Sequence, residues 1–120
     1  MPIEVGHDSS KTRRTMDVDG KAYAYYSLDA AKEAGLGDFS NLPKSLKVLA
    51  ENLMRFEDGN TTTVEDIKAF ADWAQNGGKT NREIAYRPAR VLMQDFTGVP
   101  AVVDLAAMRD AIETLGGDAS

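Results

Sequence analysis

The chain has 120 residues, 42% of them hydrophobic and 28% charged, a composition typical of one modest globular domain. Cysteine is absent, which excludes disulfides, a cysteine nucleophile and a cysteine-ligated iron–sulfur cluster within these residues. The formal net charge of −5 disfavours nucleic-acid binding, because that affinity comes largely from cationic side chains.

Residues 1–12 form a polar leader that we expect to be flexible. No signal peptide and no run of roughly 20 apolar residues is visible, so we expect a cytoplasmic protein that does not bind membranes. The single histidine, His7, lies beside Asp8 and Ser9. A solvated imidazole near the chain end is a simpler interpretation than a Ser–His–Asp relay or a metal site.

Residues 14–28 predict a β-hairpin. Asp19 and Gly20 suit the positive φ angles of a two-residue turn, and alternating apolar residues flank them. Tyrosines at positions 23, 25 and 26 would fit a base-stacking platform, but few cations accompany them. Packing of these rings within the strands is therefore the better interpretation.

Two amphipathic helices are predicted after a short helix at 28–34. The first opens at Pro43, with Ser40 or Asn41 as capping candidates, and ends near 58–60. Its apolar stripe repeats every three to four residues and should be core. The stripe consists of Leu46, Leu49, Ala50, Leu53 and Met54.

The second amphipathic helix is predicted to start with a capping box of Thr62 and Glu65 and to end at 77–78. Asp66 and Asp72 lie on different faces of this helix, so we interpret them as a solvated surface and not as an acid–base pair. The apolar face consists of Val64, Ile67, Phe70, Ala71 and Ala74.

The remaining residues predict one strand–turn–helix unit. The apolar run at 91–93 is typical of a strand buried on both faces, and the turn follows at 97–98. A helix at 100–115 is apolar nearly all round and should be buried all round. Because one strand does not make a sheet, we infer that this α/β chain is an incomplete part of a larger domain.

Gln94 and Asp95 follow the predicted strand directly. Ligands bind outside the carboxyl ends of strands in open α/β sheets, and a helix N-terminus favours anions. The amide of Gln94 offers hydrogen-bond donors without a charge, which suits a small acid. The alternative is that this amide only holds the turn in place.

Arg87 and Arg90 flank Pro88 just before the predicted strand. A guanidinium group could hold a carboxylate ligand with two hydrogen bonds. An ion pair with a structural aspartate, for which Asp104 is one candidate, or bonds to helix carbonyls are the better interpretation.

The string YRPARVLMQDFTGVPAVVDLAAMRDAI at 86–112 resembles the amino-terminal region of the aconitase and iron-regulatory-protein family. The strings AYYSL, LPKSLKVLAENLMRFEDG and TVEDI resemble the same family in the same order. The resemblance extends from about Thr12 to Gly117 and is greatest to the bacterial and cytosolic type of aconitate hydratase.

This resemblance implies a hydro-lyase that interconverts citrate and isocitrate through cis-aconitate, with a 4Fe-4S cluster held by three cysteines. It implies a three-layer α/β/α domain, of which residues 13–117 would be an incomplete part and 118–120 a truncated end. In this family the glutamine of the MQDFTG motif contacts substrate, and that position is Gln94 here. The cluster cysteines, the catalytic serine and the Asp–His pairs have no counterparts. We therefore expect no catalytic or metal-binding residue here and no activity of the 120 residues alone.

Three classes of function remain open. The first is a segment of an aconitate hydratase, or of a methylcitrate-type hydro-lyase, that supplies scaffold and Gln94 to the remainder of its parent chain. The second is RNA-binding translational control, because some family members bind RNA hairpins after losing the cluster. The third is a free-standing interaction module, which should be compact, whereas the first class predicts exposed apolar surface.

Overall fold

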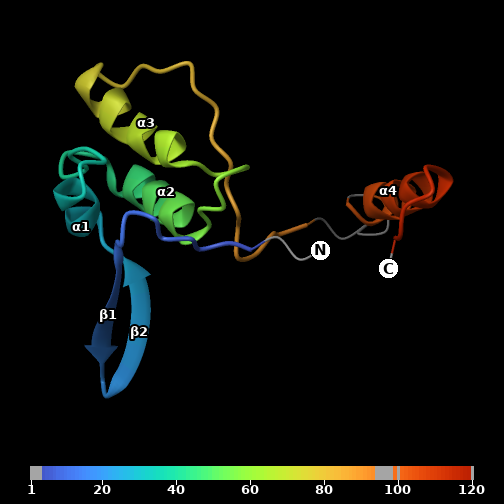
Figure 1. The fold of residues 1–120 in the computed structure, drawn as a ribbon, viewed down its shortest axis with the longest axis horizontal. Helices are drawn as coiled ribbons and strands as arrows, with labels where there is room; N and C mark the ends of the chain where they lie inside the picture. The colour runs from blue at the N-terminus through green and yellow to red at the C-terminus, as the bar shows by residue number, and fades with distance from the viewer. Residues whose placement is uncertain (1–3, 94–98, 100, 120) are drawn as a thin grey trace. The chain divides into compact units, whose positions relative to one another are not determined.

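The computed structural model describes residues 4–93, 99 and 101–119 (Figure 1). The chain divides into two compact units, Met1–Arg87 and Pro88–Ser120. The described residues of the first unit form a hairpin and three helices, and those of the second form one helix. This mixed content agrees with the predicted α/β class, whereas the three-layer arrangement and the domain bounds stay predictions.

The predicted hairpin is confirmed. Strands β1 (Arg13–Val18) and β2 (Lys21–Tyr26) pair antiparallel, with Val18 opposite Lys21 at the turn. The φ angles of Asp19 and Gly20 are +54° and +78°, as a two-residue primed turn requires. Figure 1 shows the hairpin extending from the helices of its unit, and most of its residues are exposed.

The three tyrosines of β2 differ in how far they are buried. Tyr26 is buried in the core, where the guanidinium of Arg55 lies 5.3 Å from its ring centre. Tyr23 is exposed, and the Lys21 ammonium group lies 5.2 Å from its ring. All three tyrosines lie in β2 as predicted, with Tyr23 opposite Met16 of β1, but only Tyr26 is buried.

The three helices of the first unit enclose its core. They are α1 (Leu28–Glu33), α2 (Lys44–Arg55) and α3 (Val64–Gln75), and the predicted apolar stripes of α2 and α3 face inward. The buried cluster combines β2, the helices and the loop after α1: Tyr26, Ala31, Leu36, Phe39, Leu42, Ala50, Leu53, Met54, Ile67 and Phe70.

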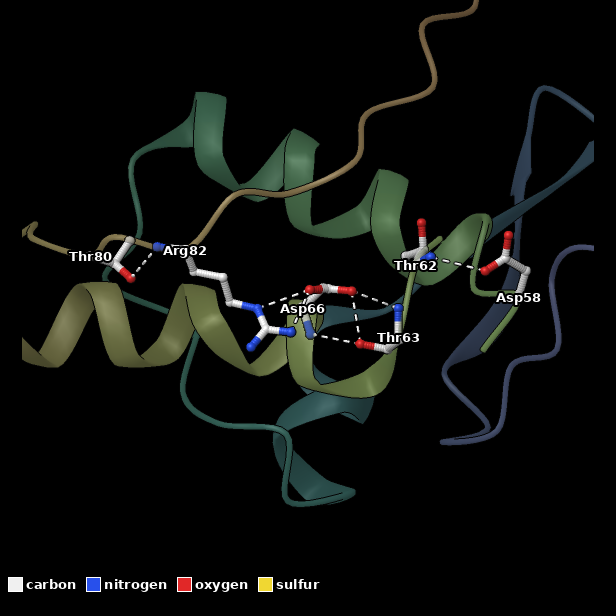
Figure 2. Close-up of polar contacts among 6 residues, drawn as sticks. All are labelled: Asp58, Thr62, Thr63, Asp66, Thr80 and Arg82. Atoms are coloured by element: carbon white, nitrogen blue, oxygen red, sulfur yellow. Dashed lines mark hydrogen bonds and ion pairs between the residues drawn. The ribbon is translucent and has the colours of Figure 1, made fainter. Parts of the chain in front are cut away.

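Two predicted helix caps are wrong. Helix α2 has Pro43 as its N-cap and no side-chain cap, because neither Ser40 nor Asn41 bonds to its first turn. The capping box of α3 is formed by Thr63 and Asp66, one residue later than predicted (Figure 2). The backbone N–H of Thr62 instead donates to Asp58, so residue 62 belongs to the preceding turn.

The C-terminal unit contains α4 (Val102–Thr114), and Gly116 follows its end with a φ of +80°. The predicted helix is confirmed, but none of its residues is buried. The predicted buried strand at 91–93 is wrong for this structure, since these residues form no strand and Leu92 is 100% exposed. A strand buried on both faces needs neighbouring strands and covering helices, and the described residues supply none there. No helix among the described residues has the length and apolar character to cross a bilayer.

Candidate functional site

The predicted ligand residue Gln94 and its neighbour Asp95 lie outside the described residues. The structure therefore describes the residues that precede Gln94, up to residue 93, but not Gln94 itself. Among the arginines and the aspartate considered above, Arg90 is exposed, and so is Asp104 in the first turn of α4. Arg87, the last residue of the first unit, is the most extensively bonded of these residues.

The side chain of Arg87 forms a structural ion pair. Its Nη2 atom lies 3.0 Å from Asp58 Oδ2 and 3.0 Å from Thr61 Oγ1. The guanidinium also lies 5.5 Å from the ring centre of Phe56, within range of a cation–π contact. Pairing with a structural aspartate is thus confirmed, but the aspartate is Asp58 and not Asp104.

The backbone of Arg87 is held as well. The side-chain Nδ2 of Asn52 donates to the Arg87 carbonyl at 2.8 Å, and the Arg87 N–H donates to Asn52 Oδ1 at 3.1 Å. One amide group on α2 thereby satisfies both backbone groups of one residue, as a neighbouring strand would. We refer to Asn52, Asp58, Thr61 and Arg87 as the Arg87 cluster.

Asp58 is the buried carboxylate of the Arg87 cluster, with its side chain only 1% exposed. Besides Arg87, it accepts hydrogen bonds from the Thr61 hydroxyl and from the backbone N–H groups of Asn60 and Thr62. The Thr61 hydroxyl and these N–H groups stabilise the charged form and hold the pKa of Asp58 well below its usual range. A carboxylate held in this way is a structural anion, not a proton donor at neutral pH.

A second arginine of the same segment pairs with α3 (Figure 2). Arg82 places Nε at 2.9 Å and Nη2 at 2.6 Å from Asp66 Oδ1, while Oδ2 accepts from the N–H and hydroxyl of Thr63. Partial burial opposes ionisation of Asp66, but the Thr63 and Arg82 hydrogen bonds outweigh it and hold its pKa below the usual value. The solvated-surface interpretation holds for Asp72, which is exposed, and is wrong for Asp66.

The leader is bonded to the loop after α2 through Glu57, a residue that no sequence pattern singled out. The Glu57 carboxylate accepts from the N–H of Ser9 at 3.1 Å and from the Ser9 hydroxyl. Its carbonyl accepts from the N–H groups of Gly6 and His7. The His7 side chain is exposed, which agrees with a solvated imidazole. The flexibility of residues 1–12 stays a prediction.

The sequence of this chain is similar to known proteins of one enzyme family. The model of the aconitase family (aconitate hydratase) matches residues 65–120. The chain is 62% identical over 118 residues to aconitate hydratase A of Legionella pneumophila, covering 98% of this chain and 13% of that protein. The chain belongs to the aconitase family. This confirms the resemblance on which the sequence interpretation depended.

Two further relatives of this aconitase-family chain are also named aconitate hydratase A. Aconitate hydratase A of Pseudomonas aeruginosa is 63% identical over 111 residues, covering 92% of this chain and 12% of that protein. The protein of the same name from Escherichia coli is 63% identical over 107 residues, covering 89% and 12%. The chain thus spans about one eighth of the length of these curated relatives. No solved structure matches it.

The iron–sulfur cluster that the family implies does not fit the residues of this chain. Such clusters are held by cysteine thiolates, and the sequence contains no cysteine. The carboxylates described above are also engaged: Asp58 and Asp66 each bond to an arginine, and Glu57 bonds to Ser9. This aconitase-family segment therefore offers structural ion pairs and one candidate substrate residue, Gln94, but no cluster ligand.

Proposed function

We propose that this chain is a segment of an aconitate hydratase that interconverts citrate and isocitrate through cis-aconitate. The observation that carries the proposal is an identity of 61–63% over 89–98% of the chain to proteins named aconitate hydratase A. Similarity of sequence does not by itself establish function, which depends on the residues of the site. This segment has one candidate substrate-contacting residue, Gln94.

Gln94 is proposed as a substrate contact. A neutral amide can donate to a substrate carboxylate or hydroxyl without adding a charge that would have to be desolvated. A hydrogen bond to a charged group contributes about 1.5–3 kcal/mol, which corresponds to roughly ten- to hundredfold in kcat/KM. The remaining residues of the segment act as scaffold.

When bound in the complete enzyme, the cluster supplies Lewis-acid chemistry through its iron. Its thiolate ligands have to come from outside this cysteine-free sequence. We therefore expect the purified 120-residue chain to show no turnover of citrate or isocitrate. Formation of cis-aconitate by this chain alone, followed by its ultraviolet absorption, would contradict the proposal.

A chimaera tests the proposal in an active background. Residues 1–120 replace the 118-residue matching segment of the Legionella aconitate hydratase A, and both directions of turnover are measured. We expect activity close to that of the parent enzyme on citrate and isocitrate. Weak turnover of these acids with strong turnover of a methylcitrate-type acid would favour the alternative hydro-lyase.

Gln94→Ala in the chimaera tests the substrate contact. We expect kcat/KM to fall roughly ten- to hundredfold, since one hydrogen bond to the substrate is lost. Gln75→Ala is the matched control, because Gln75 is an exposed glutamine at the end of α3. Equal effects of the two substitutions would exclude a special role for Gln94.

A further inference from the structure

We propose that Asn76 and Gly77 form a site of spontaneous deamidation, and that its isoaspartate product loosens the C-terminal end of α3. The inference goes beyond the proposed function and does not rest on it, because it concerns only described residues of the first unit. Among the asparagines of the sequence, Asn76 is the one that a glycine follows. The five asparagines are Asn41, Asn52, Asn60, Asn76 and Asn81.

The reaction needs only these two residues and water. The backbone nitrogen of Gly77 attacks the side-chain carbonyl carbon Cγ of Asn76, the Cγ–Nδ2 bond breaks, and the amide proton of Gly77 leaves with the amino group as ammonia. Water then opens the cyclic imide at either of its carbonyl groups and gives aspartate or isoaspartate. Glycine favours the attack, because it has no Cβ atom beside the attacking nitrogen and its backbone is the least restricted.

Asn76 is exposed at the end of a helix, where this ring can form once the helix end opens. It is the C-cap of α3, and Gly77 after it is exposed as well. The φ and ψ angles of Asn76 are −90° and +22°. At this ψ angle the Gly77 nitrogen points away from the Asn76 side chain, so the ring forms only after rotation about the Cα–C bond. The reaction therefore depends on transient opening of the last turn of α3.

The last turn of α3 has features that favour such opening. The N–H of Asn76 donates to the Asp72 carbonyl, and the N–H of Gly78 donates to the Trp73 carbonyl, both at 2.9 Å. The turn contains no basic residue that would offset the negative end of the helix dipole. Gly77 and Gly78 have φ angles of +63° and +83° and gain more conformational freedom on opening than other residues would. Opening of this turn should therefore require less free energy than opening of the core.

The isoaspartate product changes the helix end that Trp73 packs against. Its side-chain carbon enters the backbone, so the chain between position 76 and Gly77 becomes one atom longer. This moves the Gly78 N–H away from the carbonyl of Trp73. Gly78 also lies against the ring of Trp73, since a Cβ atom added to Gly78 would be 3.1 Å from Trp73 Cζ2. Because Trp73 packs against the core, the modification should loosen the end of α3 and lower the stability of the first unit.

Incubation of the folded 120-residue chain at mildly alkaline pH, followed by unfolding and tryptic digestion, tests the site. The peptide 69–79 contains Asn76, and the peptide 56–68 contains Asn60, which is also exposed but is followed by Thr61. By mass spectrometry, we expect conversion of amide to acid to be roughly tenfold or more faster at Asn76, because the glycine leaves the attacking nitrogen unhindered. Conversion should accelerate as the pH rises, since the Gly77 amide must lose its proton. Equal conversion of the two peptides would overturn the proposal.

Two variants test the chemistry of the site. Gly77→Ala places a methyl group beside the attacking nitrogen and should reduce conversion of Asn76 to the level of the Asn60 peptide. Asn76→Gln keeps an exposed amide but requires a larger ring, so the peptide 69–79 should then convert no faster than the Asn60 peptide. Undiminished conversion in either variant would exclude the Gly77 nitrogen as the attacking group.

The isolated product tests the loosening of α3. The isoaspartate form is separated chromatographically from the incubated chain and identified by its resistance to a protease that cleaves before aspartate. In urea unfolding followed by tryptophan fluorescence, its midpoint should lie below that of Asn76→Asp, which has the new charge without the longer backbone. A midpoint equal to that of the unmodified chain would show that the modification does not loosen α3.

Discussion

Gly37→Ala should destabilise the first unit much more than Gly35→Ala does. Gly37 has a φ of +125°, and a Cβ atom there would lie 2.2 Å from the Cβ of Ala71 on α3. Gly35 also has a positive φ, +79°, but a Cβ atom added to it would meet nothing within 4 Å. Both substitutions strain the backbone, because alanine disfavours a positive φ, but only Gly37→Ala adds a steric clash.

The magnitudes follow from this difference. A positive φ costs a residue with a side chain about 1–2 kcal/mol, and this is the whole expected effect at Gly35. Two carbon atoms pack at about 3.5–4 Å, so a contact at 2.2 Å forces the loop and α3 apart. Overpacking of this kind costs about 1–3 kcal/mol more. We expect about 2–5 kcal/mol for Gly37→Ala.

Urea unfolding of the 120-residue chain, followed by tryptophan fluorescence, measures both variants. Trp73 is the sole tryptophan of the sequence and packs against the core from α3, so its emission reports on the first unit. Adding Ala71→Gly to Gly37→Ala should restore part of the stability, less about 1 kcal/mol for glycine in a helix. Equal midpoint shifts for Gly35→Ala and Gly37→Ala would refute the steric reasoning.

Three more outcomes are expected. Asp66→Ala removes the capping box and should cost about 1 kcal/mol of unfolding free energy in urea titration, whereas Asp72→Ala on the exposed face should have little effect. Since the folded pKa of Asp58 is lowered, its contribution is complete above about pH 4 and is lost as the pH falls further; acid titration of Asp58→Asn should therefore show a smaller loss than the unmodified chain. Leu105 and Met108 of α4 are exposed, so Leu105→Glu with Met108→Glu should reduce hydrophobic-dye binding; unchanged binding would show that the dye binds elsewhere on the chain.

Local patterns predicted most of the first unit correctly. The Asp19–Gly20 turn depends on positive φ angles that these two residues tolerate, so neighbouring residues decide it. The stripe of α2 likewise repeats with the helical period, and Leu53 and Met54 are buried as predicted. Where one face of a helix or strand is apolar and the core that it packs against lies within the same chain, the period of the apolar residues is sufficient to predict that element.

The cap of α3 and the ion pairs of Arg82 and Arg87 could not be predicted from the period of the apolar residues, because they depend on contacts between residues far apart in the sequence. Thr62–Glu65 and Thr63–Asp66 have the same spacing, and the glutamate makes the first pair the better candidate by composition. The bond from Arg82 to Asp66, sixteen residues away, accompanies the second pair instead. Nothing in the sequence singled out this contact, and the same holds for the two hydrogen bonds between the Asn52 side chain and the Arg87 backbone.

The C-terminal unit gives the last prediction, because its wrong strand and its exposed helix have one physical cause. A strand at 91–93 needs partners for its backbone groups, and α4 needs cover for apolar residues on all sides; the described residues supply neither. A lone helix of 13 residues is marginal in water, while each fully buried Leu, Ile or Met contributes about 1.5–3 kcal/mol. We therefore expect fast hydrogen exchange along α4 in the 120-residue chain. In the chimaera, where the rest of the enzyme follows the segment in the same chain, we expect slow exchange. Equal exchange in both proteins would show that α4 does not depend on packing against the rest of an aconitase.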